Sequence, residues 1–291
     1  MSYVPAEAAR RQALEAVISH LRCPVCDAPV RLAGPQLICD NRHGFDIARQ
    51  GYVNLTTGRA SPGTADTASM IAARERFLGG GHYRPLARAL RSLAARYEPG
   101  GPGLVADLAG GTGYYLAAVL DGLPHRFGLC VDLAAPALRR AARAHPRAAA
   151  LGADVWQRLP LAARSAAVML SVFGPRNADE IDRILTADGT LIIAAPGKAH
   201  LAELRQPLGL IGVDQRKPQR LADAFAAYDR PGTEALTYRL DLDHADLAAL
   251  AAMGPSAHHI PPDVLADRIR ALPSPTAVTV DLHISVYQRR G

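Results

Sequence analysis

The chain has 291 residues, of which 49% are hydrophobic, and its formal net charge is +6 at pH 7. This length exceeds that of a typical domain, so we expect one large domain and one small one. No apolar run approaches the roughly eighteen residues of a transmembrane helix, and the first residues lack the order of a signal peptide. Composition therefore argues against a membrane protein and predicts a cytoplasmic location.

Arginine supplies almost all of the positive charge, because the 33 basic residues include only Lys198 and Lys217 as lysines. Residues 1–100 hold 13 arginines and 8 acidic residues, so most of the net charge lies in this third of the chain. Guanidinium groups bind phosphate well. This part of the sequence is a candidate surface for a polyanion, with ordinary solvated charge as the alternative.

A short helix is predicted over residues 6–21, and a cluster of metal-binding residue types follows it. Cys23 and Cys26 are succeeded by Cys39 and His43, with the spacing C-x2-C-x12-C-x3-H. Such pairs on two tight turns can close a tetrahedral zinc site of three sulfurs and one nitrogen. Four protein ligands leave no open position, so we predict one structural Zn²⁺ ion that stabilises a segment too short for a core of its own.

A strand over residues 51–55 and a Gly, Ser and Pro-rich linker over residues 57–64 are predicted after the metal ligands. The linker places a domain boundary near residue 60. We therefore expect a zinc ribbon with a leading helix over residues 1–60 and a second domain over residues 61–291.

Two helices are expected at the start of the second domain. Thr64 and Asp66 are candidate caps for a helix that ends near Leu78, where three glycines stop it. The next helix is predicted from Tyr83 to Tyr97, with apolar residues on one side. These helices precede the first strand of the domain and could form a lid over it.

From residue 103 onward, strands and helices alternate, which predicts an α/β fold with a parallel, doubly wound sheet. Strands are expected near residues 103–107, 126–131, 147–152, 166–172 and 190–195. Helices are expected near residues 113–121, 134–145, 177–186 and 199–208. Two late strands, 236–242 and 277–287, flank helices near 244–253 and 262–271, which suits an antiparallel edge of the sheet.

The first strand of this pattern runs into a glycine turn that can bind a cofactor. Asp107 ends the strand, and Gly111 and Gly113 allow backbone conformations that a side chain would forbid before the next helix. The third glycine of a dinucleotide motif is missing, because Leu116 stands there. The remaining pattern is similar to the first motif of class I S-adenosylmethionine-dependent methyltransferases. Asp132, after the next strand, is expected to bind ribose hydroxyls.

Further candidates follow the third and fourth strands. Asp154 is expected to accept a hydrogen bond from the adenine amine, and Val155 or Trp156 to pack on the ring, with burial in the core as the alternative for Trp156. Phe173 is a candidate for stacking on a target base, while Arg176 or Asn177 would hold its edge or its phosphate. An ordinary turn followed by a helix cap is the alternative for this stretch.

Motifs spread over the whole chain resemble one known family. They are the cysteine and histidine ribbon, Phe45-Asp46, Gly51-Tyr-Val-Asn-Leu55, Gly81-His-Tyr83, the cofactor turn and Pro196-Gly-x-x-His200-Leu. Together they resemble the RlmA family of 23S rRNA guanine-N1 methyltransferases. Three further stretches, at residues 153–156, 172–177 and 253–256, are similar to its actinobacterial, tylosin-resistance branch.

The resemblance implies contacts with S-adenosyl-L-methionine at Tyr83, Gly111, Thr112 and His200, and zinc at the four ribbon ligands. It also implies that a 23S rRNA hairpin near the peptide exit tunnel is the partner, and it leaves a homodimer open. The ribbon would then contact the hairpin backbone through its arginines, which are Arg31, Arg42, Arg49 and Arg59. One departure is Ala109, which replaces the usual first glycine of the turn.

Two other functions stay open at this point. A small-molecule methyltransferase would use the ribbon as a substrate lid, and a non-catalytic protein would bind RNA with its ribbon and carry an inactive cofactor domain. The sequence leaves the catalytic base unassigned, since an aspartate, a histidine or a water relay could remove the guanine proton.

Overall fold

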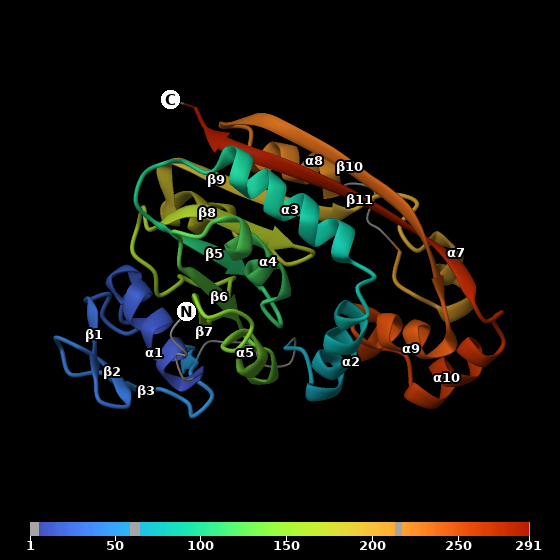
Figure 1. The fold of residues 1–291 in the computed structure, drawn as a ribbon, viewed down its shortest axis with the longest axis horizontal. Helices are drawn as coiled ribbons and strands as arrows, with labels where there is room; N and C mark the ends of the chain where they lie inside the picture. The colour runs from blue at the N-terminus through green and yellow to red at the C-terminus, as the bar shows by residue number, and fades with distance from the viewer. Residues whose placement is uncertain (1–5, 59–64, 213–216, 291) are drawn as a thin grey trace.

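One large sheet organises the molecule (Figure 1). The computed structural model describes residues 6–58, 65–212 and 217–290, and in these ranges eight strands pair in the order β10-β11-β9-β8-β5-β6-β7-β4. The central strands are β5 (Leu104–Leu108), β6 (Gly128–Asp132), β7 (Ala148–Gly152), β8 (Ala166–Val172) and β9 (Leu185–Pro196). The outer strands are β4 (Val53–Asn54), β10 (Tyr228–Leu242) and β11 (Thr276–Arg289).

The sheet is parallel in its centre and antiparallel at one edge. Strands β4 to β9 pair in parallel, whereas β11 is antiparallel to both β9 and β10. Strands β5, β7 and β8 are buried along their whole length, as expected for a parallel sheet that helices cover on both faces. The predicted doubly wound sheet with an antiparallel edge is confirmed.

Two separate clusters of buried side chains hold the helices on opposite faces of the sheet. One cluster joins the sheet to α3 (Arg84–Tyr97), α4 (Tyr114–Gly122) and α5 (Ala135–Ala141). The other joins it to α1 (Ala6–Val17) and α6 (Ala178–Ile184), with a further contact from α8 (Lys217–Ala224). In α3, Leu86, Leu90 and Leu93 are buried at helical spacing while the opposite side of the helix faces solvent.

The zinc-ligand segment forms a small antiparallel sheet of its own. Its strands are β1 (Val30–Ala33), β2 (Gln36–Cys39) and β3 (Gly44–Asp46), paired in that order. The segments before and after it, α1 and β4, pack on or pair with the large sheet instead. Strand β4 pairs with β7, and Leu14 and Val17 of α1 share a core cluster with Val131 of β6. The first 60 residues therefore contribute both a ribbon and part of the large core.

The remaining helices lie near the carboxyl ends of the central strands. They are α2 (Ala68–Gly79), α7 (Ala202–Leu208), α9 (His244–Ala252), the 3-10 helix η3 (Pro255–His258) and α10 (Pro262–Arg270). In the part of the chain that the structure describes, no helix has both the length and the apolar character that crossing a bilayer requires.

The start of α2 differs from the prediction. The cap is Thr67, whose hydroxyl accepts a hydrogen bond from the backbone amide of Met70 at 3.3 Å. Asp66 instead forms an ion pair with Arg74, and Thr64 lies outside the described residues. The prediction that Asp66 caps the helix was wrong, because its carboxylate is bound by the Arg74 side chain.

The late strand β10 is longer than predicted. It begins at Tyr228, eight residues before the expected start at Leu236. Most of its side chains are exposed or half-buried because it forms the outer edge of the sheet, so apolar residues do not alternate along its first half. Helix α8 was not predicted either.

We expect Leu14→Ala to weaken the large sheet although Leu14 precedes the ribbon. This side chain is 2% exposed and packs in a core cluster with strands of the large sheet, so its loss should lower the free energy of unfolding by about 2–5 kcal/mol. Arg11→Ala is the matched control on the exposed side of α1, with an expected change within about 0.5 kcal/mol. Urea unfolding followed by circular dichroism measures both, and equal midpoints for the two variants would contradict this packing.

Candidate functional site

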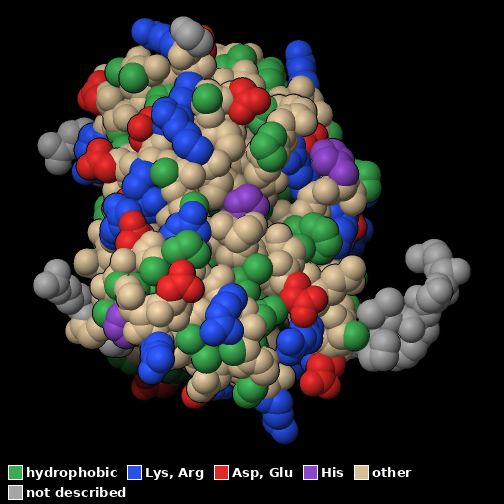
Figure 2. Space-filling model, turned by 90° about the vertical axis from the view of Figure 1, so that its left-hand side faces the viewer, with side chains coloured by type: hydrophobic (Ala, Val, Ile, Leu, Met, Phe, Trp, Pro, Cys, Tyr) green, Lys and Arg blue, Asp and Glu red, His purple; other side chains and the backbone are tan. Residues whose placement is uncertain are grey.

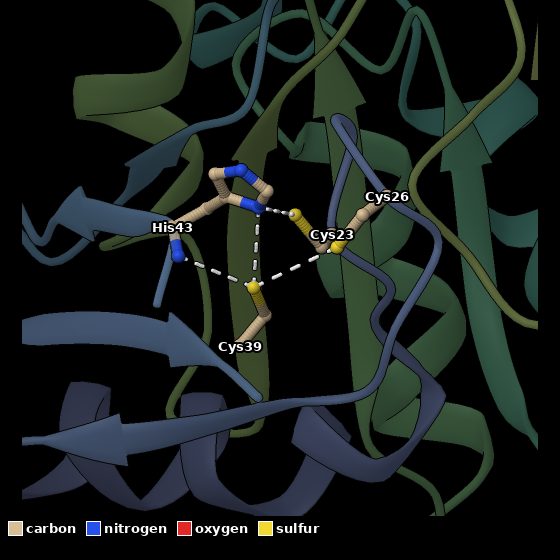
Figure 3. A group of neighbouring side chains, drawn as sticks. All are labelled: Cys23, Cys26, Cys39 and His43. Carbon is tan, nitrogen blue, oxygen red and sulfur yellow. Dashed lines mark hydrogen bonds between the residues drawn. The ribbon is translucent and has the colours of Figure 1, made fainter. Parts of the chain in front are cut away.

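The four predicted metal ligands converge on one point at the base of the ribbon (Figure 3). Their ligand atoms all lie within 4.8 Å of one another. The Sγ atoms of Cys26 and Cys39 are 3.7 Å apart, and the Nδ1 atom of His43 lies 3.5 Å from the Sγ of Cys23 and 3.4 Å from that of Cys39. The two halves of the site come from the turn before β1 and the turn between β2 and β3.

These distances fit a tetrahedral zinc ion. With Zn–S bonds of about 2.3 Å and a Zn–N bond of about 2.0 Å, a tetrahedron places sulfurs about 3.8 Å apart and sulfur about 3.5 Å from nitrogen. The backbone amide of Ala28 is the main cause that lowers the pKa of the Cys26 thiol to about 6, which favours the thiolate that zinc binds. Three sulfurs and one nitrogen fill the coordination sphere, so the ion is structural.

A cavity of about 1040 Å³ opens at the carboxyl ends of the central strands. Residues at or just after the ends of four strands line it, including Gly111 after β5, Asp132 at the end of β6, Asp154 after β7 and Phe173 after β8. Ligands of open α/β sheets bind at this edge. The cavity is large enough for a nucleoside cofactor and part of a second molecule.

The turn after β5 leaves little room for side chains. Ala109, Gly111 and Gly113 have φ angles of +54°, +58° and +76°, the left-handed region that favours glycine. A Cβ on Gly110 would lie 2.7 Å from both the Asp107 carboxylate and the Cys130 sulfur. Glycine at position 110 therefore lets the turn pack closely on the buried residues beneath it.

Ala109, where the usual glycine is replaced, is accommodated by the opposite loop. A Cβ on Gly174 would come within 3.0 Å of the Ala109 methyl group, so the glycine at position 174 provides the space for it. Gly113 was predicted to bind the cofactor, but it is not among the residues that line the cavity. A Cβ at this position would meet Ala141 and Ala144, so glycine lets α4 begin close to the end of α5.

Asp132 connects the turn to the neighbouring strand. Its Oδ2 atom accepts a hydrogen bond from the amide of Gly111 at 2.9 Å, and its Oδ1 atom accepts one from the amide of Ala134 at 2.8 Å. Burial is the main effect that raises the pKa of Asp132. Each oxygen keeps a lone pair, so the carboxylate can accept hydrogen bonds from ribose hydroxyls in the cavity.

Asp107 is a buried acid without a partner. Neither of its carboxylate oxygens has a hydrogen-bond partner among the described residues, and the side chain is 1% exposed. Burial, followed by the charge of Asp132, raises the pKa of Asp107 from 3.8 to about 8. An unpaired acid beneath the turn fits a cationic ligand such as S-adenosylmethionine, because a nearby positive charge would stabilise the carboxylate.

Three aromatic rings form one wall of the cavity. Tyr83, Phe173 and His200 have ring centroids 6.0 to 6.3 Å apart, and the Phe173 and His200 rings are stacked. Phe173 has a φ angle of +59°, and Leu201, which follows His200, has a φ angle of +53°. Strained backbone of this kind persists only where the surrounding structure enforces it, and here it turns both residues into the cavity.

The hydrogen bonds of His200 define its protonation. Its Nδ1 atom accepts from the amide of Asp281 at 3.3 Å, and its Nε2 atom lies 3.3 Å from the hydroxyl of Tyr83. Burial lowers the pKa of His200 to about 4, so the ring is neutral at pH 7 and carries its proton on Nε2. His200 then donates to the Tyr83 oxygen, which leaves the Tyr83 hydroxyl hydrogen free to donate to a ligand.

The structure brings most of the predicted site residues to this cavity, but it does not bring all of them. Trp156 lines the cavity and is 62% exposed, which excludes the alternative of core packing. Arg176 and Asn177 do not line it. The guanidinium of Arg176 points to the carbonyl of Ala194, and Asn177 caps α6 by accepting from the amide of Glu180.

Part of the cavity wall was missed at the sequence level. Arg74 of α2 forms an ion pair with Asp66 at 2.7 Å and donates to the carbonyl of Met253 at 3.0 Å, which ties α2 to the end of α9. The hydroxyl of Ser256 in η3 accepts from the amide of Ile211 at 3.0 Å. No local pattern reveals these contacts, because Arg74 and Met253 are 179 positions apart.

A zinc ribbon joined to a doubly wound sheet with an antiparallel edge, and a cofactor cavity at its strand ends, define a methyltransferase of class I with an added metal centre. Residues 21–56 match the family model described as the N-terminal part of RlmA. A 23S rRNA (guanine(748)-N(1))-methyltransferase of Streptomyces fradiae is 48% identical over 272 residues, which cover 93% of this chain and 97% of that protein.

Two further relatives have names of the same kind. A protein of Micromonospora griseorubida, named for guanine-N(1) methylation of 23S rRNA, is 47% identical over 94% of this chain and 98% of its own length. A Bacillus subtilis protein with the same kind of name is 34% identical over 84% of this chain and 89% of its own. The chain belongs to the RlmA family of 23S rRNA (guanine-N(1))-methyltransferases.

We expect Cys39→Ser to release the zinc and to unfold β1–β3, because one of the four ligands is lost. Elemental analysis should then find no zinc, and amide hydrogen exchange should lose protection in the ribbon but keep it in β5–β8. Cys130→Ser is the matched control, since Cys130 is buried in β6 and should leave one zinc per chain. A Cys39→Ser protein that retained its zinc would contradict the ligand set.

We expect Asp107→Asn to change how stability depends on pH. Below the ordinary pKa of 3.8 the carboxyl is protonated in both folded and unfolded chains; between there and about 8 only the folded chain keeps the proton. The free energy of unfolding of the wild type should therefore fall by about 1.4 kcal/mol per pH unit relative to Asp107→Asn in this window. Without cofactor, urea titrations at pH 5, 6 and 7 measure it.

The exposed Asp188 provides the control, because Asp188→Asn should run parallel to the wild type. Parallel lines for Asp107→Asn as well would mean that the Asp107 carboxyl is ionised in the folded protein at pH 5.

Proposed function

We propose that this protein transfers a methyl group from S-adenosylmethionine to N1 of a guanine in a hairpin loop of 23S rRNA. The observation that carries the proposal is the cavity, which joins a cofactor turn with an unpaired acid to a wall of three aromatic rings. The identity of 48% with the Streptomyces fradiae enzyme over nearly the whole chain supports the choice of base and atom.

The residues around the turn would hold the cofactor. Asp132 would accept from the ribose hydroxyls, and Asp154 from the adenine amine, with the exposed ring of Trp156 beside it. Asp107 would stabilise the positive charge of the methionine part from beneath the turn. When bound, S-adenosylmethionine supplies an electrophilic methyl group on a sulfonium.

The aromatic wall would receive the target base. Phe173 offers a ring face for stacking. Tyr83 and neutral His200, for which the family resemblance implies contact with the cofactor, can also orient a purine edge without adding a charge. The free hydroxyl hydrogen of Tyr83 is suited to an oxygen acceptor such as guanine O6. Holding the base in line with the methyl group accounts for a large part of catalysis, by about 7–11 kcal/mol at the upper limit.

A hairpin loop is the suitable substrate because its bases can leave the stack. N1 of a paired guanine in an A-form stem is engaged in the base pair, whereas a loop base can enter a cavity at low cost. We also propose that ribbon arginines contact the hairpin backbone. Arg31, Arg42 and Arg49 are exposed there, and Arg59 lies outside the described residues.

The finer proposal concerns the position in the rRNA. The relative from Streptomyces fradiae is named for guanine 748, and we propose the corresponding guanine near the peptide exit tunnel for this protein. An N1 methyl group removes a hydrogen-bond donor and adds bulk to the base edge. A macrolide of the tylosin type that lies against this base would lose a contact, so the modification would confer resistance.

Primer extension on methylated rRNA tests the proposal. An N1 methyl group blocks Watson–Crick pairing, so incubation of unmodified 23S rRNA with enzyme and cofactor should produce one new reverse-transcriptase stop next to a single guanine. Gly111→Val should abolish the stop, because Gly111 lines the cavity in a left-handed conformation that a β-branched residue adopts only with strain, and the new side chain would meet the Arg74 guanidinium. A stop at an adenine, or methyl label found only in a small molecule, would refute the substrate.

A further inference from the structure

A second hollow, of about 700 Å³, lies between α2, α3, α4 and α5. We call it the arginine groove, because five guanidinium groups line it, those of Arg84, Arg88, Arg91, Arg140 and Arg143. Two acidic residues, Glu75 and Asp121, also line it, so positive charge predominates.

The arginines of α3 follow the exposed side of the helix. Arg84, Arg88 and Arg91 are spaced by four and three residues, so they lie on one face, opposite the buried leucines. Side chains at this spacing are about 5–6 Å apart at their Cβ atoms. The helix therefore presents a row of positive charges along the groove.

Most of these charges have no acidic partner. Arg140 pairs with Glu75 at 2.8 Å. In the ranges that the structure describes, Arg84, Arg88, Arg91 and Arg143 form no ion pair. A bound phosphate group would give these guanidinium groups the anionic partners that the described residues do not supply.

The arginine groove adjoins the cofactor cavity. Leu78, Thr112 and Tyr114 line both hollows, so the groove ends beside the cofactor turn. A strand that lies along the groove would therefore end next to the cavity. This position distinguishes the groove from an isolated basic surface.

The ribbon segment carries its positive charge less densely. Residues 1–60 hold seven arginines and five acidic residues, whereas residues 61–100 hold six arginines and three acidic ones. On the side where the ribbon lies, Figure 2 shows basic and acidic side chains interspersed. The net charge of the first third of the chain is thus +2 in residues 1–60 and +3 in the shorter segment that contains α2 and α3.

From this geometry we infer that the arginine groove binds the phosphodiester backbone of the single RNA strand next to the target base and leads that base into the cofactor cavity. The inference rests on the proposed function and adds a site for the substrate. Arginine forks suit phosphate oxygens, and the row on α3 gives the strand a direction without reading its sequence. The ribbon would then hold a different part of the same RNA.

A comparison of two double variants tests the groove. The groove pair, Arg88→Glu with Arg143→Glu, reverses two charges in the groove. The outer pair, Arg96→Glu with Arg139→Glu, reverses two charges on α3 and α5 that do not line the groove. Affinity for an unmodified 23S rRNA hairpin transcript is measured at several salt concentrations. We expect the groove pair to bind the RNA at least tenfold more weakly than the wild type. The slope of log K against log salt concentration should be smaller in magnitude by about 1.4 to 1.8, because two phosphate contacts are lost. The affinity of the outer pair should change less than threefold.

Cofactor affinity is the second measurement, and quenching of the only tryptophan, Trp156, by S-adenosylmethionine reports it. It should be unchanged in both pairs. Arg88→Gln with Arg143→Gln provides a milder groove variant should the glutamates prevent folding. If the groove and outer pairs bound RNA with equal affinity while the wild type methylated the rRNA, the groove inference would be wrong and the proposed function would stand. A wild type that methylates no 23S rRNA would overturn the proposed function as well.

Discussion

The hydrogen bond from the Gly111 amide to Asp132 is the contact on which the site depends. It joins the turn after β5 to the end of β6 at 2.9 Å and so fixes a left-handed backbone beside a neighbouring strand. The same carboxylate contributes to the raised pKa of Asp107 beneath the turn. One interaction thus shapes the space for a cofactor and keeps an unpaired acid next to it. The acid costs stability until a cation is bound, which is typical of a preorganised binding site.

The metal centre and the large sheet are connected more closely than a ribbon on a linker would be. Zinc holds β1–β3, which are too small for a core of their own, while α1 and β4 on either side of the ribbon pack against β6 and β7. The chain therefore enters and leaves the ribbon from fixed points on the sheet. This arrangement gives the ribbon a defined position relative to the cavity.

Charge is distributed unevenly between the two hollows. The aromatic wall is neutral, since burial lowers the pKa of His200 and keeps its ring uncharged at pH 7. A neutral wall suits a base that stacks and is oriented by hydrogen bonds. The arginine groove beside it is positive and suits a backbone of phosphates. The separation assigns the base and the backbone of one nucleic acid strand to adjoining surfaces, so neither surface has to bind both.

The sequence by itself determined the features that depend on local spacing. The zinc ligands, the alternation of strands and helices over residues 103–208 and the glycine turn each follow from residue types at short separations, and the structure contains all three. Family resemblance also indicated Tyr83 and His200, which lie 117 positions apart and meet at one wall.

Only the tertiary structure decided which candidates face a ligand. Asn177 caps a helix and Arg176 turns to a backbone carbonyl, although both follow the same strand as Phe173. The contact of Arg74 with Met253 and the row of arginines beside the cavity arise from packing between helices far apart in the chain. The physical reason is that a side chain's direction and its distant neighbours are fixed by how whole elements pack, which residue order at one place does not encode.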